Sequence, residues 1–234
     1  MKLSVVIPCY NEAENIPLIL EKFSSVITNE DVEVVMVDNG SSDGSSEILD
    51  SLLPKYPFAT RTRVEINQGY GYGILQGLKV AKGDFLGWTH ADMQTDPGDI
   101  VKAYHVLEKN NWNDNIYVKG SREGRSLGER FFTFGMGVFE TLYLGKKLFD
   151  INAQPNIFAR RFFESWENPP YDFSLDLYAL YMAGIKGLEV KRIKVQFPPR
   201  MHGASHWNTG LASKWKFIKR TIDFSINLNK RGIK

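Results

Sequence analysis

The feature that most constrains the fold of this chain is the regular alternation of short apolar runs and amphipathic stretches in its first 110 or so residues. Short β-branched apolar runs fit strands buried on both faces, and apolar residues three and four apart fit helices packed on a sheet. The strand-like runs are 3–7, 32–37, 61–66 and 85–88, and the helix-like stretches are 12–27, 47–53, 74–81 and one opened by Pro97. This alternation predicts an α/β fold, a Rossmann-like and mostly parallel sheet with helices on both faces.

A polar cluster follows each of these four strand-like runs. The clusters are Tyr10-Asn11-Glu12, Asp38-Asn39, Asn67 to Gly73 and His90 to Asp96. In parallel sheets, ligands bind beyond the carboxyl ends of the strands. We therefore expect four loops to converge on one cleft.

Composition narrows the class of protein. The 234 residues suit one domain, and 43% apolar with 24% charged residues is ordinary for a globular protein. The single Cys9 allows no internal disulfide, which makes the cytoplasm the default compartment. No stretch approaches the roughly 18 apolar residues of a membrane span, so we expect none. We also expect no nucleic-acid partner.

The second half of the chain is less regular. A strand and turn are predicted within 150–161, a helix at 173–183, a strand at 188–197 and a helix from Leu211. The last helix would present one apolar face, formed by Leu211, Trp215, Ile218, Ile222 and Ile226. Residues 214–234 carry seven basic side chains and one acid, about +6, so the rest of this +2 chain is about −4.

Residues 90–96, HADMQTD, are either a metal and substrate site or a polar loop after a strand. Side chains at i and i+2 after a strand point to the same side, so His90 and Asp92 can share an ion. Asp96, before Pro97, is predicted to cap the next helix. The glycines of NQGYGYG follow the third strand with G-x-G-x-G spacing, which favours a tight turn into a helix over a dinucleotide site.

Several other polar residues are candidates for binding anions or a nucleotide. Asp38 ends a buried strand, where its carboxylate can accept hydrogen bonds from a ribose or a base. Arg122 and Arg200 are each expected in a Gly/Ser-flanked loop beyond a strand, as phosphate clamps. His202 and His206 are either structural or exposed, or they contact a phosphate or a metal.

An ordered set of motifs resembles family 2 glycosyltransferases with the GT-A fold. The motifs are IPCYNEAENI (7–16), VDNGSSDGS (37–45), NQGYGYGILQGLKVAKGD (67–84), HADMQTDP (90–97), GSR (120–122) and RMHGAS (200–205). The nearest branch looks like dolichol-phosphate mannose synthase and its bacterial polyprenyl-phosphate relatives. The likeness is close over about 3–122 and looser over 150–206.

The resemblance implies an inverting, metal-assisted transfer of a sugar from a nucleotide-diphosphate sugar to a polyprenyl-linked or glycan acceptor in surface polysaccharide assembly. The cofactor would be Mn²⁺ or Mg²⁺. The implied metal ligands are His90, Asp92 and Gln94, with His90 where the branch has the first Asp of Asp-Ala-Asp-Leu-Gln. The implied nucleotide-sugar-binding residues are Pro8, Tyr10, Glu12, Asp38, Asn67, Gly71, Ala91 and Arg200. Asp92 and Arg122 would take part in catalysis.

The chain departs from the branch at two places. His90 removes one negative charge and suits Mn²⁺ better than Mg²⁺. His206 follows Ser205 where the branch usually has a lysine, so a hydroxyl acceptor is open as well as a phosphate, with His202, Ser205 and His206 as phosphate or metal contacts. A hydroxyl would need a general base. Asp176, or else Asp172, is the candidate, unless both acids lie on a solvated helix face.

Two questions stay open at the level of the whole chain. We expect one GT-A domain, with a nucleotide-sugar half at about 1–122, an acceptor half at about 123–210 and a basic helix at 211–234. That helix would either pack on the domain or lie on an anionic membrane as a peripheral contact, placing the protein at the inner face. The alternative function is a catalytically impaired nucleotide-sugar-binding protein, with His90 as the lesion.

Overall fold

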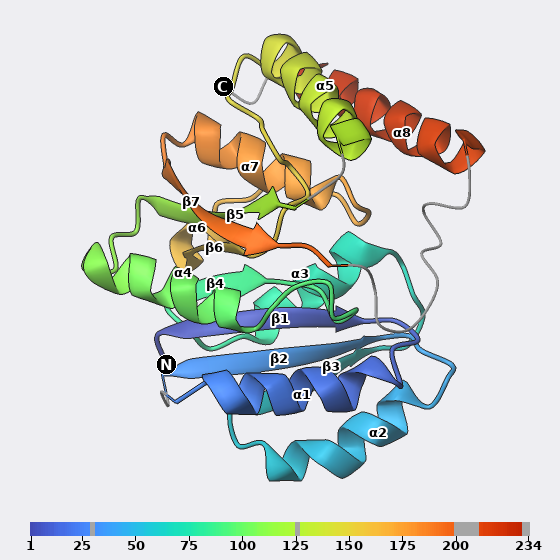
Figure 1. Cartoon of the computed structure of the whole chain (residues 1–234), viewed down its shortest axis with the longest axis vertical. Coiled ribbons are helices and arrows are strands. Elements are labelled where there is room, and N and C mark those ends of the chain that lie inside the picture. The colour runs from blue at the N-terminus through green and yellow to red at the C-terminus, as the bar shows by residue number, and fades with distance from the viewer. Residues whose placement is uncertain (29–30, 125–126, 199–210, 231–234) are drawn as a thin grey trace.

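The computed structural model of the chain describes residues 1–28, 31–124, 127–198 and 211–230, and its core is one seven-stranded sheet (Figure 1). The strands are β1 (Leu3–Cys9), β2 (Val32–Asn39), β3 (Ala59–Val64), β4 (Phe85–Trp88), β5 (Ile116–Glu123), β6 (Asn156–Ala159) and β7 (Glu189–Gln196). Their order across the sheet is β3-β2-β1-β4-β6-β5-β7. Strand β6 runs antiparallel to β4 and β5, and the other pairs are parallel, which confirms a mostly parallel sheet.

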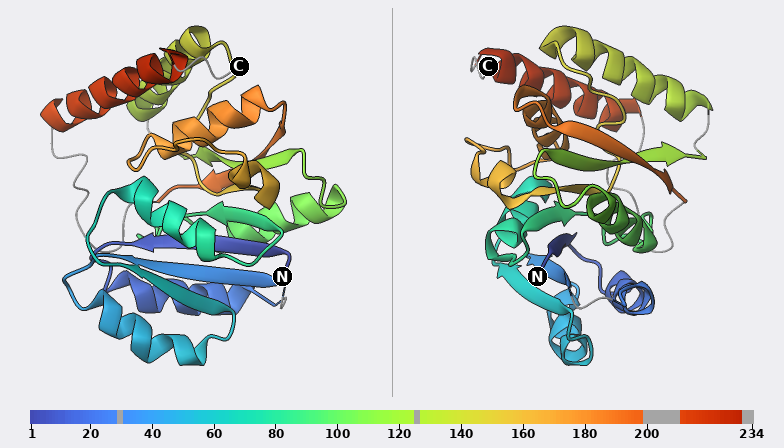
Figure 2. Two further views of the ribbon diagram at one scale, coloured as in Figure 1. Left: turned by 180° about the vertical axis from the view of Figure 1, so that it is seen from behind. Right: turned by 90° about the vertical axis from the view of Figure 1, so that its left-hand side faces the viewer.

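Helices cover both faces of this sheet (Figure 2). The helices are α1 (Asn15–Val26), α2 (Ser45–Leu52), the 3₁₀ turn η1 (Leu53–Lys55), α3 (Tyr70–Val80), α4 (Gly98–Lys109), α5 (Leu127–Leu144), α6 (Arg160–Glu164), α7 (Leu175–Ile185) and α8 (Leu211–Lys230). Side chains of α1, α2 and α4 pack on one face of the sheet, and those of α3, α6 and α7 pack on the other. Burial of these two apolar layers is the main stabilising term of such a fold.

The chain changes direction across the sheet at β1. Strands β2 and β3 lie on one side of β1, and β4 lies on the other. This reversal leaves a crevice outside the carboxyl ends of β1 and β4, which is where doubly wound sheets bind ligands. The polar clusters after β1 and β4 begin at that crevice.

Several elements differ from the sequence prediction: β3 begins two residues earlier than predicted, and β5 and α6 were not predicted. Helix α3 begins at Tyr70, four residues before the predicted start, so Gly71 and Gly73 lie inside the helix. Helix α5 was not predicted, because glycines and aromatic residues at irregular spacing hide its period. In α8, the fully buried described side chains are Ser225 and Leu228, whereas the predicted face at Ile218, Ile222 and Ile226 is only half-buried.

Helices α5 and α8 pack side by side at one end of the molecule (Figures 1 and 2). Within the described part of the chain, none of the helices is both long enough and apolar enough to span a bilayer.

Candidate functional site

Each of the four predicted loops contacts the next one along the carboxyl edge of the sheet. The Asn11 backbone N–H donates to Ser41 Oγ at 3.1 Å, and the Asn39 amide donates to Gly69 O at 3.1 Å. The ring of Tyr70 in turn lies 5.8 Å from the ring of His90. The structure therefore brings the four loops together.

Asp38 presents a carboxylate oxygen that has no donor. The side chain is fully buried, and its Oδ1 accepts the Ser41 N–H at 3.0 Å. Its Oδ2 has no hydrogen-bond partner among the described residues, and Arg63 Nε lies 3.9 Å away. A buried acceptor without a donor costs about 1–3 kcal/mol, so the oxygen is well placed for the hydroxyl or N–H of a ligand.

Two of the three glycines of NQGYGYG, Gly69 and Gly71, make room for protein backbone. A Cβ on Gly71 would lie 2.6 Å from both Pro170 O and Asp172 O, and a Cβ on Gly69 would lie 2.4 Å from Tyr171 O. The Tyr72 N–H donates to Tyr171 O at 2.9 Å. The close approach required here is that of segment 170–172, which leads into α7. The predicted turn into a helix is present, with Gly69 at φ 118° directly before α3, and the contact with segment 170–172 gives a steric reason for Gly71.

His90, Asp92 and Gln94 follow β4 on a tightly bent segment. Met93 adopts a left-handed backbone with φ 59°, and Gln94 N–H donates back to Asp92 Oδ1 at 3.1 Å. Asp92 is only 5% exposed, and His90 is half-buried. The Gln94 amide nitrogen donates to Pro198 O at 3.1 Å, which fixes that amide against the segment after β7.

The donor atoms of this segment fit a divalent cation as a partial set. They offer one imidazole nitrogen and two kinds of side-chain oxygen, which suits Mn²⁺ and, less well, Mg²⁺. In the described ranges, no three His, Cys, Asp or Glu side chains are grouped to hold a metal. An ion here would need further oxygens from a ligand.

Asp96 has the predicted capping role. Its Oδ1 accepts the Gly98 N–H at 2.8 Å at the start of α4. Burial raises the pKa of Asp96, but hydrogen bonds from Gly98 and Lys22 outweigh this effect and lower it overall.

Arg122 lies within strand β5, paired with Val195, and not in a loop as predicted. Asp150 holds its guanidinium, with Oδ1 at 2.8 Å from Nε and 2.6 Å from Nη2. The two side chains are 11% and 14% exposed, and the guanidinium carbon lies 5.5 Å from the ring centroid of Phe197. The predicted phosphate clamp is therefore preorganised by a carboxylate, with which an anion would have to share the arginine.

Arg122 lines a pocket between the sheet and the helical layer of α5, α7 and α8. The volume of the pocket is about 110 Å³. Its lining residues are Arg122, Thr133, Met136, Ile151, Asn152, Phe173, Ser174, Leu177 and Thr221. The pocket combines one cation and several hydroxyl and amide groups with an apolar wall.

Asp176 lies in a buried polar network and not on a solvated helix face. It is 2% exposed, and its Oδ1 accepts from Gln154 Nε2 at 2.8 Å and from Asn156 Nδ2 at 2.9 Å. Lys119, which is fully buried, donates to Asn156 Oδ1 at 2.6 Å. The other acid, Asp172, accepts the Ser174 N–H at 2.8 Å just before α7.

Burial dominates the electrostatics of this network. It lowers the pKa of Lys119 from 10.5 to about 7, with Asp176 opposing the shift. Burial also raises the pKa of Asp176, an effect that Lys119 and His90 oppose. Tyr70 links this network to segment 90–94, because its hydroxyl accepts from Gln154 Nε2 at 3.3 Å and its ring lies 5.8 Å from the His90 ring.

The remaining predicted residues fall into two groups. Pro8 is half-buried at the end of β1, Tyr10 is 46% exposed beyond it, and Ala91 packs in the core. Glu12 accepts from Asn15 at 2.5 Å, and Asn67 accepts the Gly69 N–H at 2.8 Å, so both shape the loops. The predictions for Arg200, His202, Ser205 and His206 fall outside the described residues.

The sequence prediction missed several residues of this region. They are Tyr70, Lys119, Asp150, Gln154, Asn156 and Phe173. Lys119 and Asn156 had a recognisable signal, since each is a polar residue beside an apolar strand run. The others come together only through the tertiary fold.

The family model of glycosyl transferase family 2 matches residues 4–174. The chain belongs to glycosyl transferase family 2. The matched region contains the polar loops after β1, β2, β3 and β4 and the Arg122–Asp150 pair, and it ends just before α7.

Two curated relatives are similar to about half of this family 2 member. The undecaprenyl-phosphate 4-deoxy-4-formamido-L-arabinose transferase of Yersinia enterocolitica is 34% identical over 112 residues, covering 46% of this chain and 34% of the relative. The uncharacterized glycosyltransferase YfnE of Bacillus subtilis is 37% identical over 120 residues, covering 51% and 30%. The chain thus spans about a third of the length of the curated relatives it matches.

Solved structures confirm the GT-A fold for this family 2 chain. Glucosyl-3-phosphoglycerate synthase from Mycobacterium tuberculosis, in complex with Mn²⁺, UDP and glucosyl-3-phosphoglycerate, aligns with a TM-score of 0.68 at 15% identity, covering 96% of this chain and 78% of the other. The mannosyltransferase PcManGT from Pyrobaculum calidifontis, in complex with GDP-Man and Mn²⁺, gives 0.67 at 18% identity, covering 93% and 60%.

Proposed function

We propose that this chain is an inverting glycosyltransferase that moves a sugar from a nucleotide-diphosphate sugar to a polyprenyl-phosphate, or else to another lipid-linked or glycan acceptor, in surface polysaccharide assembly. Membership of family 2 and the undecaprenyl-phosphate relative support the reaction class. The observation that carries the proposal is the carboxyl edge of the sheet. There, the Asp38 oxygen that accepts no hydrogen bond from the described residues and the Asp92 segment lie in linked loops, near a pocket that contains Arg122.

Asp38 is the proposed anchor of the nucleotide. Its buried Oδ2 would accept a hydrogen bond from a ribose hydroxyl or a base N–H, which removes the cost of an unsatisfied acceptor. The similar structures hold UDP or GDP-mannose, which supports a nucleotide-sugar donor without choosing the base.

His90, Asp92 and Gln94 would hold Mn²⁺ or Mg²⁺ together with oxygens of the donor diphosphate. The bound ion would offset the negative charge that develops on the departing nucleotide diphosphate. Mn²⁺ in both similar structures supports a divalent ion, and the imidazole of His90 favours manganese.

The Arg122 pocket is the proposed site for the acceptor. Arg122 lines it directly. Burial lowers the pKa of Lys119 and of Arg192, and the carboxylates of Asp176 and Asp150, respectively, oppose these shifts. A phosphate acceptor is already an anion and needs no general base, which suits the enclosed position of Asp176. We therefore propose that Asp176 holds the network in place and that a phosphate is the acceptor group.

The proposed place of action is the cytoplasmic face of a membrane, with α5 and α8 toward the lipid. Exposed apolar side chains gather on α5 and just after it: Phe134, Phe139, Leu142, Tyr143 and Phe149. The neighbouring α8 supplies basic residues, which attract anionic headgroups.

The first test is a screen of UDP- and GDP-sugars for thermal stabilisation, with and without Mn²⁺, followed by turnover with undecaprenyl phosphate. A donor at one hundred times its Kd should add about 2.7 kcal/mol of stability. Asp38→Asn should abolish this gain, and Asp92→Asn should abolish its dependence on Mn²⁺. Glu21→Gln, an exposed change on α1, is the control and should behave as the parent protein does.

The same screen separates the alternatives. Metal-independent binding without turnover, in the parent protein and in His90→Asp alike, would mean a nucleotide-sugar-binding protein. Activity that appears only in His90→Asp would mean a damaged site. Turnover with a free glycan hydroxyl but none with undecaprenyl phosphate would contradict the proposed acceptor.

A further inference from the structure

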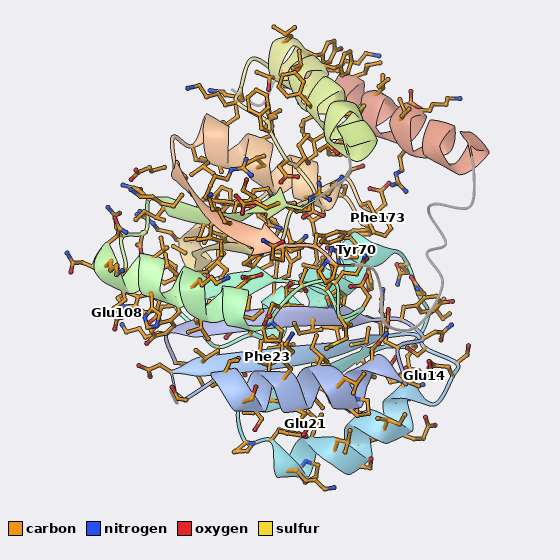
Figure 3. The ribbon with its side chains drawn as sticks, viewed as in Figure 1. Glu14, Glu21, Phe23, Tyr70, Glu108 and Phe173 are labelled. Carbon is orange, nitrogen blue, oxygen red and sulfur yellow. The ribbon has the colours of Figure 1, made fainter. Side chains whose placement is uncertain are left out.

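A row of aromatic contacts connects helix α8 with segment 90–94, which contains the proposed metal ligands His90, Asp92 and Gln94. The ring of Tyr70 lies 5.8 Å from the His90 ring, and it stacks on the Phe173 ring with centroids 4.4 Å apart and planes 2° apart. Figure 3 labels Tyr70 and Phe173, which lie near each other. The Arg220 guanidinium carbon of α8 lies 5.3 Å from the Phe173 centroid. We name His90, Tyr70, Phe173 and Arg220 the aromatic bridge.

Polar contacts hold the aromatic bridge at two points. Arg220 Nε lies 3.6 Å from Asp172 Oδ2, next to Phe173, and Arg220 is two-thirds buried. Gln154 Nε2 donates to the Tyr70 hydroxyl at 3.3 Å and also to Asp176. The stacked rings are thus fixed from α8 on one side and from the buried network on the other.

The backbone around the bridge is closely packed. Segment 170–172 lies directly on Gly69 and Gly71, where no Cβ would fit. The Tyr72 N–H donates to Tyr171 O at 2.9 Å, so the start of α3 and the segment before Phe173 are joined. A displacement of Phe173 would therefore be transmitted to Tyr70, because close-packed groups do not deform independently.

We propose that α8 sets the position of His90 through the aromatic bridge, with Arg220, Phe173 and Tyr70 as positioning residues for this metal ligand. The proposal rests on the metal site in the proposed function. Groups that orient a metal-ligating histidine tune its affinity for the ion, and their loss costs about 10–100-fold. Arg220 is a suitable end residue for the aromatic bridge, because cation–π attraction holds its guanidinium over the Phe173 ring.

The bridge gives α8 a function beyond packing. Any contact that changes how α8 packs on the acceptor half would change the position of His90. The change would pass through residues that do not touch the donor. The proposed lipid contact of α5 and α8 would then be coupled to ion binding at the donor site.

The test compares Arg220→Ala, Phe173→Leu and Phe173→Tyr in the full chain. The first readout is the imidazole NMR signal of His90 in metal-free protein, assigned among the four histidines by its loss in His90→Gln. The second is Mn²⁺ affinity in the presence of UDP, followed by electron paramagnetic resonance. Asp223→Ala removes an exposed charge from the same helix and is the control.

We expect Arg220→Ala and Phe173→Leu to shift the His90 signal and to weaken Mn²⁺ binding by about tenfold. Phe173→Tyr keeps the stacked ring and should restore both readouts, and Asp223→Ala should change neither. This pattern distinguishes positioning from a general loss of stability, which the thermal midpoint of each variant reports separately.

The proposal is overturned if the His90 signal is the same in the parent protein, Arg220→Ala and Phe173→Leu. It is also overturned if Mn²⁺ affinity falls without a change at His90, because the effect would then bypass the bridge. If Arg220→Ala does not fold, Phe173→Leu against Phe173→Tyr decides. If the parent protein binds no Mn²⁺, the proposed metal site fails, and the NMR signal still tests the connection.

Discussion

At the scale of single residues, one histidine and one glycine give the most information about this site. His90 puts an imidazole where a third carboxylate was expected, beside Asp92 and within the field of the buried Asp176. Gly71, predicted to face a nucleotide, instead faces two backbone carbonyls. Each residue gives a prediction that depends on a different physical term: ligand chemistry for His90 and steric exclusion for Gly71.

His90→Asp should shift the metal preference from Mn²⁺ toward Mg²⁺. An oxygen ligand replaces a nitrogen ligand, and Mg²⁺ prefers oxygen. We expect the ratio of Mg²⁺ to Mn²⁺ affinity to rise by about tenfold, which equals about 1.4 kcal/mol. Titration calorimetry with UDP present measures both affinities. An unchanged ratio would show that position 90 does not bind the ion.

Gly71→Ala should destabilise the protein by about 1–3 kcal/mol, which is the usual range for overpacking a filled site. The new Cβ would lie 2.6 Å from Pro170 O and Asp172 O, so segment 170–172 would have to move. Urea unfolding followed by circular dichroism measures the change.

Gly135→Ala in α5 is the matched control for this substitution. A Cβ there meets nothing within 4 Å, so the change should stabilise the helix by up to about 1 kcal/mol. Equal effects of the two substitutions would contradict the steric account of Gly71.

At the scale of elements, the contact between α5 and α8 contains an acid that burial makes neutral. Glu140 of α5 is fully buried and accepts a hydrogen bond from Ser225 Oγ of α8 at 2.6 Å. Burial raises the pKa of Glu140 from 4.5 to about 7, and the hydrogen bond from Ser225 opposes the shift. The folded state therefore keeps a proton between pH 4.5 and about 7 that the unfolded chain has released.

The stability of the protein should fall as pH rises through that window, by about 3 kcal/mol from this residue alone. Glu140→Gln should remove this part of the dependence and should be more stable than the parent protein above pH 7. Glu164→Gln, an exposed change on α6, serves as control. Chemical unfolding at pH 5 and pH 8 gives the comparison. A parallel pH dependence in the parent protein and Glu140→Gln would contradict the assignment.

Elements also show why the sequence predicted one half of the fold better than the other. Strands β1, β2 and β4 are apolar runs, and β4 was predicted with its bounds at Phe85 and Trp88, whereas β3 contains two arginines and was predicted two residues too late. Strand β6 owes its antiparallel place to β4 and β5, which are far from it along the chain. Lys119 had a local signal, but its contact with the network of Gln154 and Asp176 could not be predicted, because tertiary packing alone brings these residues together.

At the scale of the whole molecule, the surface formed by helices α5 and α8 is the part that would meet a membrane. The exposed side chains are large and apolar: Leu142 is 79% exposed and Phe134 is 61% exposed. Contiguous exposed apolar groups with basic neighbours are typical of interfacial helices. The buried Ser225 and Leu228 show that one face of α8 packs on the protein, so that lipid contact would have to use another face of the helix.

The parent protein should bind vesicles that contain anionic phospholipid, and binding should weaken as salt rises. Replacing Lys214, Lys216 and Lys219 by Gln should weaken it by at least about tenfold, because each basic residue near such a surface contributes about 1 kcal/mol. Leu142→Asp should have a similar effect, because a charge replaces an apolar side chain that would enter the headgroup region. Co-sedimentation with vesicles measures all three proteins.

The control removes three exposed lysines elsewhere, Lys55, Lys79 and Lys109, so that net charge falls equally while the helical layer is unchanged. Equal losses in the two triple variants would mean that net charge, and not this surface, drives binding. No binding by the parent protein would remove the membrane from the proposal and leave the donor site untouched. Because α8 also contacts Phe173 through Arg220, vesicles that bind the parent protein should change its Mn²⁺ affinity, but they should not change that of Phe173→Leu. That difference would show that vesicle binding at α5 and α8 is coupled to Mn²⁺ binding at segment 90–94.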